Sequence, residues 1–204
     1  MKRHNFILLL QPARGGLFLL LPVVLCTGLN LLFSLLNNSV LRSPLFLDSI
    51  FTAAAGALYG PWAGLATGLV TNLAMEPVYG MTGFYWPFAV CNMATGLIVG
   101  LAVRRRLFSS GFQVTLIILG VTLANSLLGA LVSQLIYRGN TGVPVDYIVS
   151  AFTEMGQSLI SASFWARIPT NLVDKMISVY TAYALHLLAV RDREGWEPSD
   201  PRLS

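Results

Sequence analysis

The sequence contains few charged residues and has long stretches without any. Asp, Glu, Lys and Arg make up 11% of its 204 residues, whereas soluble globular domains average about 25%. Residues 17–36, 77–103 and 114–137 carry no charge at all. Each stretch is close to or longer than the roughly 18 to 20 residues that cross a bilayer. The composition therefore excludes a large soluble domain and indicates a polytopic membrane protein.

Cysteine and histidine are also scarce. Cys26 and Cys91 both lie in apolar stretches, which argues against a disulfide framework and is typical of small core residues. The histidines are His4 and His186, and the sequence has no phosphate loop, Gly-x-Ser-x-Gly elbow or His-Glu-x-x-His helix. We therefore expect no catalytic residue, no metal site and no cofactor, and predict that the chain is not an enzyme.

The apolar runs and the turn signals between them predict an all-α fold, a bundle of six membrane-spanning helices. The expected helices cover about 16–36, 45–59, 61–75, 87–103, 112–137 and 168–190. Gly60-Pro61 separates the second from the third, because proline removes a backbone donor. These two helices span only about 22 Å each, so we expect a hairpin packed within the bundle. Residues 1–190 would form a single membrane domain with a retained first helix, and 191–204 a solvated tail.

Positive charge predicts the orientation, because Lys and Arg concentrate in cytoplasmic loops. With six spans, both termini and the triplet Arg104–Arg106 are cytoplasmic, and Arg42, Arg138 and Arg167 are left in outer loops. Residues 145–162 are predicted to form an extra helix at the outer face, because a seventh span would worsen this distribution. The net charge of +4 is thus explained by topology in the cell membrane, and we predict no binding to nucleic acid.

Small and polar residues recur every four positions in the third helix, at Gly60, Gly64, Gly68, Asn72 and Glu76. Small residues at this spacing let helix backbones approach closely in a membrane. We interpret the glycines as a helix–helix contact that Asn72 and Glu76 extend toward the outside.

The last helix carries Asn171, Asp174, Lys175 and Ser178 on one face. Asp174 would lie about 9 Å below the outer end of its helix, where ionisable residues face a cavity or a partner. Two interpretations stay open. The charges either belong to a ligand site, or Asp174 and Lys175, with Asp48, form an internal neutral pair that locks the bundle.

The outer halves of the other helices are polar as well, whereas the cytoplasmic halves are nearly apolar. The polar positions are Asn30, Ser34, Asp48, Thr52, Asn72, Asn92, Thr95, Ser133 and Gln134. This asymmetry predicts an outward-opening cavity for a small molecule, covered by 138–167 and by the aromatic loop residues Tyr79, Phe84, Tyr85 and Trp86. Aromatic residues also anchor membrane interfaces, an alternative for Trp86 and Trp165. The predicted substrate-binding residues are Asn72, Glu76, Tyr79, Trp86, Asn92, Asn171, Asp174 and Lys175.

Two stretches, 47–72 and 168–185, resemble the substrate-binding S component of energy-coupling factor (ECF) transporters. The matching features are an Asp near the start of the second helix (Asp48), the turn Gly60-Pro61-Trp62, a following Asn (Asn72), and Pro169 with Asp174-Lys175. The resemblance extends over about residues 16–190.

This resemblance implies capture of a vitamin or related micronutrient, with a transmembrane coupling protein and two cytoplasmic ATPases as partners. Many such proteins carry an Ala-x-x-x-Ala docking motif on the first helix, which is absent here. We therefore expect docking to the coupling protein through Ala53 and Ala57 or through Gly60 and Gly64.

Two other functions fit the sequence. The same pocket could serve a ligand-binding membrane sensor or regulatory subunit, or the polar stripes could serve packing alone in a structural protein. Asp174→Asn or Asn92→Ala is expected to abolish ligand binding in a folded protein under the pocket hypothesis, and to unfold it under the packing hypothesis.

Overall fold

The computed structural model describes residues 17–41, 43, 45–142 and 145–194, which form helices and loops without a strand. The helices are α2 (Leu17–Leu36), the π-helical turn Asn37–Leu41, α3 (Ile50–Tyr59), α4 (Pro61–Val78), the 3-10 turn Trp86–Phe88, α5 (Ala89–Arg104), α6 (Gly111–Leu135), α7 (Val145–Glu154) and α8 (Leu159–Glu194). The all-α fold class is confirmed. The predictions for the basic segment 1–16 and for 195–204 of the tail lie outside the described residues.

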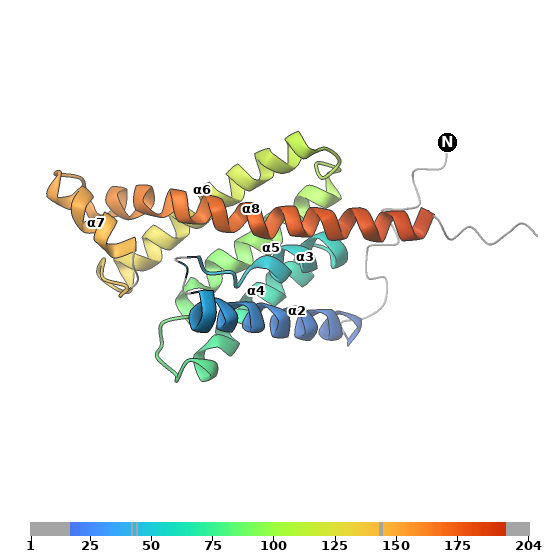
Figure 1. The fold of residues 1–204 in the computed structure, drawn as a ribbon, viewed down its shortest axis with the longest axis horizontal. Coiled ribbons are helices and arrows are strands. Elements are labelled where there is room, and N and C mark those ends of the chain that lie inside the picture. Colours follow the sequence, from blue (N-terminus) through green and yellow to red (C-terminus); the bar gives the residue numbers. More distant parts are fainter. Residues whose placement is uncertain (1–16, 42, 44, 143–144, 195–204) are drawn as a thin grey trace, which may run out of the picture.

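The helices form an elongated bundle (Figure 1). The start of α2 and the end of α8 lie at one end of the molecule, and α7 and the start of α8 lie at the other. Arg104 lies at the first end too, since its guanidinium approaches the turn at Gly60 between α3 and α4. The two ends therefore differ, one carrying the arginine turn and the other the polar groups described below.

A sharp turn joins α3 to α4, as the Gly60-Pro61 pair predicts. Gly60 has φ 98°, a conformation that side chains with a Cβ disfavour. Pro61 follows at the first position of α4, where its missing N–H costs no helical hydrogen bond. The two short helices thus fold back on each other as the expected hairpin.

Glycines bring the backbones of α3, α4 and α5 into contact. A Cβ on Gly64 would lie 2.6 Å from the carbonyl oxygen of Gly96, and one on Gly68 would lie 2.6 Å from backbone atoms of Asn92. Gly56 and Gly100 are equally close to the backbones opposite them. This glycine seam, made of Gly56, Gly64, Gly68, Gly96 and Gly100, confirms that the stripe in α4 is a helix–helix contact.

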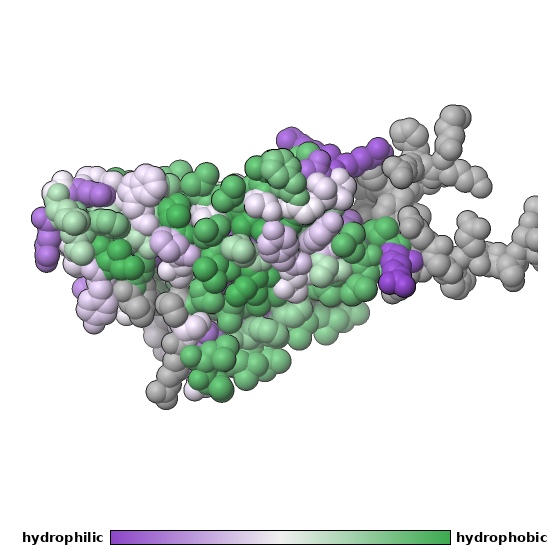
Figure 2. Space-filling model, turned by 45° about the horizontal axis from the view of Figure 1, so that its top comes forward, coloured by the Kyte–Doolittle hydropathy of each residue, from purple (hydrophilic) through white to green (hydrophobic). Residues whose placement is uncertain are grey.

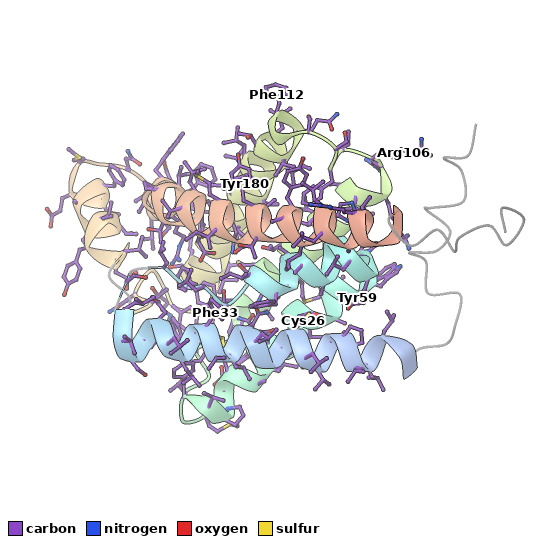
Figure 3. All side chains as sticks on the ribbon, turned by 45° about the vertical axis from the view of Figure 1, so that its right-hand side comes forward. Cys26, Phe33, Tyr59, Arg106, Phe112 and Tyr180 are labelled. Atoms are coloured by element: carbon purple, nitrogen blue, oxygen red, sulfur yellow. The ribbon has the colours of Figure 1, made fainter. Side chains whose placement is uncertain are left out.

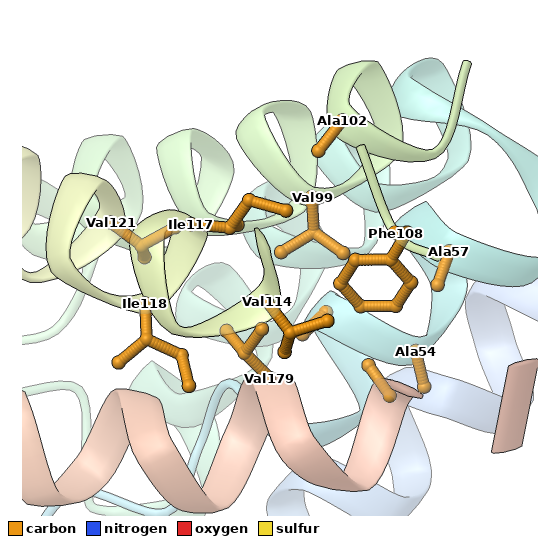
Figure 4. Packing of buried hydrophobic residues seen from close by; sticks show 12 residues of the cluster. Ala54, Ala57, Val99, Ala102, Phe108, Val114, Ile117, Ile118, Val121 and Val179 are labelled. Atoms are coloured by element: carbon orange, nitrogen blue, oxygen red, sulfur yellow. The ribbon is translucent and has the colours of Figure 1, made fainter. Parts of the chain in front are cut away.

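The apolar core lies between α3, α5, α6 and α8 (Figure 4). Val99, Val114, Val121 and Val179 are fully buried there. Phe108, from the turn that follows the arginine triplet, closes the core, its ring edge-on to that of Tyr183 at 5.3 Å. The apolar half of the bundle is therefore the half next to the arginines, as expected.

Helix α2 packs against α3 and α4 with one side only. Cys26 and Phe33 lie on the side of α2 that faces the molecule (Figure 3), and Phe33 contacts Phe51 with ring centroids 5.5 Å apart. Cys26 is buried, as predicted for a core cysteine. The opposite side of α2 exposes large apolar residues that include Leu21 and Val24.

Apolar side chains cover much of the visible surface, and hydrophilic residues gather toward its ends (Figure 2). Among the described residues, three helices are long and apolar enough to cross a membrane: Leu19–Leu41, Trp86–Arg104 and Gly111–Leu135. The count of six spans stays a prediction, and α3 is a shorter apolar helix.

Several helix boundaries differ from those predicted. Helix α3 begins at Ile50 and not near 45. Leu47 has φ 51°, which is not a helical conformation, and its N–H donates a hydrogen bond to the Asp174 carboxylate. The single helix expected over 145–162 is wrong, since α7 ends at Glu154 and Gly156, with φ 88°, breaks the chain before α8. Helix α8 then begins at Leu159 and runs through Pro169 without ending.

Candidate functional site

Helix α8 buries a polar face along much of its length. Its members are Ser163, Arg167, Asn171, Asp174 and Ser178, each at most 7% exposed. Their spacing of three or four residues places them on one side of the helix. Because buried polar groups need partners, the groups that meet this face define the candidate site.

The charges of Asp174 and Lys175 neutralise each other. The Lys175 ammonium donates to the Asp174 carboxylate at 2.7 Å and to the Ser49 hydroxyl at 2.7 Å. The other carboxylate oxygen accepts the backbone N–H of Leu47 at 2.9 Å, and the Ser178 hydroxyl lies 3.2 Å from that of Ser49. The pair thus ties α8 to the segment before α3, as in the locking interpretation.

Asp48 does not join this hydrogen-bonded pair, although it lies within electrostatic range of Lys175. Its backbone carbonyl accepts the Asn92 amide at 3.2 Å. Its side chain is only partly buried. Asp48 therefore contacts the site through its backbone carbonyl oxygen, and its carboxylate is a second acidic group near Lys175.

Asn72 and Asn92 join three parts of the chain at the same end. The Asn92 amide donates to the side-chain oxygen of Asn72 at 3.0 Å, and the Asn72 amide donates to the carbonyl oxygen of Tyr85 at 3.0 Å. The side-chain oxygen of Asn92 has no hydrogen-bond partner among the described residues. Asn171 contacts α6 instead, where its amide donates to Ser126 at 2.9 Å.

Glu76 holds the loop that follows α4. Its carboxylate accepts the backbone N–H groups of Gly83 at 2.7 Å, Tyr85 at 2.6 Å and Trp86 at 2.9 Å. Hydrogen bonds to a charged acceptor are stronger than neutral ones. The side chain that was predicted to bind substrate therefore positions the loop.

Aromatic rings cover this end of the bundle. Tyr79 stacks on Tyr85 at 4.8 Å, and its hydroxyl contacts Ser34 at 3.0 Å and Asn38 at 2.8 Å. Tyr137, at the end of α6, donates to the carbonyl of Phe84 at 2.9 Å. The loop is thus fixed to both α2 and α6.

Trp86 lies outside the buried cluster. Its side chain is 53% exposed and that of Trp165 is 55% exposed, which fits the interface alternative for both. Of the four loop aromatics that were predicted as a lid, Tyr79, Phe84 and Tyr85 are partly buried at this end.

Arg167 lies in a different position from the one that the sequence predicts. It was assigned to an outer loop, but it lies within α8 and is 5% exposed. The guanidinium carbon is 5.7 Å from the centre of the Phe88 ring, and the side-chain stem passes Gly129 of α6. Nε and Nη2 have no hydrogen-bond partner among the described residues. Its spacing of four from both Ser163 and Asn171 could have placed it on the buried face.

Further buried oxygen atoms lack partners among the described residues near the same end: the hydroxyls of Ser133 and Ser163 and the side-chain oxygen of Gln134. Uncompensated buried polar groups cost free energy, and such groups are found where a ligand or water completes the set. The arrangement offers donors, acceptors and aromatic faces, which are the elements of a binding site.

The residues predicted to dock a partner are mostly interior. Ala53 is fully buried, Ala57 is 2% exposed and Gly64 contacts Gly96, while Gly60 is partly exposed. A docking surface needs accessible side chains, so this burial argues against Ala53, Ala57 and Gly64 and leaves only the turn at Gly60.

Comparison with known protein families agrees with the interpretation of the polar end of the bundle as a binding site. A family model described as "ECF transporter, substrate-specific component" matches residues 20–186, a range that includes α3 to α6 and every residue of the polar face of α8. No solved structure matches the chain.

Proposed function

Because the chain belongs to the family of substrate-specific components of ECF transporters, we propose that it captures a vitamin or related micronutrient for ATP-driven import. Members of this family are substrate-binding membrane subunits that work with a membrane coupling protein and ATPases. Here the partners would be one transmembrane coupling protein and two cytoplasmic ATPases, since the sequence has no nucleotide-binding motif of its own.

One observation carries the proposal at the level of residues. Among the described residues, most buried polar atoms without a partner lie in the half of the bundle away from the arginine turn, where Asn92 and Arg167 contribute from α5 and α8. The exceptions are single hydroxyls of Thr27, Thr67 and Thr122. The other end contains the apolar core and the arginine turn. A receptor that binds at one membrane face needs such an asymmetry, whereas a purely structural bundle would satisfy its buried groups internally.

The arginine turn supports the orientation. Arg104, Arg105 and Arg106 follow α5, and the positive-inside rule assigns such a turn to the cytoplasm. The polar end then faces outward in a chain with six spans and both termini inside. The binding residues would include Asn92 and Asn171, with Asn72, Glu76 and Tyr79 holding the loop over them and the Asp174–Lys175 pair supporting them.

Affinity purification tests this function. The tagged chain is isolated from its native membranes in mild detergent, and mass spectrometry identifies the proteins and small molecules that remain bound. A second membrane protein, two ATPases and a bound metabolite are expected. Membranes with an unrelated tagged membrane protein serve as the control. Recovery of a kinase without ATPases would favour the alternative of a ligand-binding sensor.

A further inference from the structure

Arg167 is buried inside the bundle and has no ion-pair partner among the described residues. The side chain is 5% exposed, and both Nε and Nη2 are buried without a hydrogen-bond partner among the described residues. Arginine keeps its proton in proteins, so it cannot lower the cost of burial by becoming neutral. A buried cation without a partner is strongly unfavourable, and within membranes such residues pair or line a functional pathway.

The acidic residues at this end are engaged elsewhere or, like Asp48, do not lie within ion-pair distance of Arg167. Helices α5 and α6 contain no Asp or Glu. Asp174 is paired with Lys175, the one ion pair in the part of the chain that the structure describes. Asp146 of α7 accepts two hydrogen bonds from Thr141 and one from the N–H of Gly142. No carboxylate of the described residues lies within ion-pair distance of Arg167.

The surroundings of Arg167 suit an anion. Ser163 precedes it by one turn on the same face of α8, and Ser133 lies one turn beyond Gly129, the residue of α6 beside the Arg167 stem. Both hydroxyls are buried and without partners among the described residues. The Phe88 ring lies against the guanidinium. A planar guanidinium with nearby hydroxyl donors fits the two oxygens of a carboxylate or the oxygens of a phosphate.

We infer that Arg167 binds an acidic group of the substrate, so that the captured compound carries a carboxylate or a phosphate. The inference rests on the proposed function, because it assigns the substrate class of the same site. The Lys175 ammonium cannot take this role while it is held by Asp174 and Ser49. Arg167 is thus the buried cation at the site that has no ion-pair partner within residues 17–41, 43, 45–142 and 145–194, and the rest of the substrate would lie toward Asn92.

The test uses full-length purified protein and a metabolite extract of the native cells, freed of lipid and divided by anion-exchange resin into retained and unretained fractions. Thermal unfolding is measured for the wild type, Arg167→Gln and Arg138→Gln. Arg138→Gln is the matched control, because it removes the same charge from an exposed side chain. The retained, anionic fraction is expected to raise the Tm of the wild type and of Arg138→Gln by about 5 °C at saturating ligand, with no rise for Arg167→Gln.

Each other outcome has a defined meaning. Stabilisation by the unretained fraction alone, or equal stabilisation of Arg167→Gln, would overturn the inference while leaving substrate capture in place. Stabilisation by neither fraction would contradict both. If only phosphatidylglycerol nanodiscs, and not phosphatidylcholine ones, stabilise the wild type, the anion is a lipid headgroup and the inference fails. Phosphatase treatment of an active anionic fraction distinguishes a phosphate from a carboxylate.

A second measurement separates binding from a structural role. Without ligand, Arg167→Gln is expected to unfold at the same temperature as the wild type or a higher one, because the substitution removes an unpaired buried charge. A lower Tm than that of the wild type, with recovery in Arg167→Lys, would show that the cation supports the fold and would overturn the inference.

Discussion

The ammonium of Lys175 lies 2.7 Å from the carboxylate of Asp174, its neighbour in sequence. Adjacent side chains point about 100° apart around a helix, so the long lysine stem has to bend toward the aspartate. Both groups are almost completely buried and share Ser49 as a further partner. The two charges act as one neutral unit that connects α8 to the start of α3.

This unit predicts a stability defect for Asp174→Asn. The substitution leaves the buried Lys175 ammonium without its counter-charge, which is expected to cost about 3 kcal/mol and to lower the Tm by about 10 °C. Glu154→Gln, an acid-to-amide change at an exposed residue of α7, is the control and should leave the Tm unchanged. A folded Asp174→Asn protein with wild-type Tm would show that the pair contributes nothing to stability.

Glu76→Gln is expected to release the loop after α4. The carboxylate accepts three backbone N–H groups with its two charged oxygens, whereas the amide of Gln has one uncharged oxygen that can accept. The free energy of local unfolding of the loop should therefore fall by about 2 kcal/mol. Hydrogen exchange at Gly83 and Tyr85 would then be faster by about 30-fold. The core of α6 provides an internal reference, since its exchange should not change. Unaltered protection in the loop would contradict the anchoring role.

Gly64→Ala is expected to destabilise the bundle, because its Cβ would meet the Gly96 carbonyl oxygen at 2.6 Å. Overpacking of this kind costs about 1–3 kcal/mol. Gly120→Ala is the matched control in α6, where a Cβ meets nothing within 4 Å and the better helix propensity of alanine should stabilise slightly. In thermal unfolding, Gly64→Ala should lower the Tm relative to the wild type and Gly120→Ala should raise it slightly. Changes in Tm of the same sign would argue against the glycine seam.

Cysteine labelling can establish the orientation. Ser109 follows the arginine turn and Asn140 lies beyond α6, and both are exposed. A membrane-impermeant maleimide added to intact cells should label Asn140→Cys but not Ser109→Cys. After the membrane is opened, it should label both variants. The parent protein shows the background from its two native cysteines. Labelling of Ser109→Cys from outside would reverse the proposed topology.

The sequence predicted the helices best where a single physical effect dominates. The charge-free stretches contain α2 and most of α5 and α6, and Gly60-Pro61 marked the turn between α3 and α4. The predicted helix boundaries are wrong where tertiary contacts determine the end of a helix. The apolar residues 45–47 suggest that the helix begins there, but the Leu47 N–H donates to the Asp174 carboxylate. No local pattern reveals a partner that distant in the chain.

The site was predicted in part for a similar reason. The spacing predicts the polar face of α8, but the predicted start of the helix at about residue 168, next to Pro169, leaves Arg167 in a loop. A proline within a membrane helix is tolerated when neighbouring groups compensate for the lost hydrogen bond. Composition also could not separate residues that bind a ligand from those, such as Glu76, whose partners are backbone amides of their own loop.

The glycine seam also divides the molecule mechanically. Where Gly64 of α4 meets Gly96 of α5, no side chain separates the two backbones, so these helices cannot slide without a steric collision. Together with α3 they behave as one rigid block. Helix α8 contacts this block and α6 through side chains such as the fully buried Val179, and not through direct backbone contact. The block and α8 are therefore joined in two different ways: the block is held by backbone contacts within it, and α8 is attached to it by buried hydrogen bonds to the segment before α3.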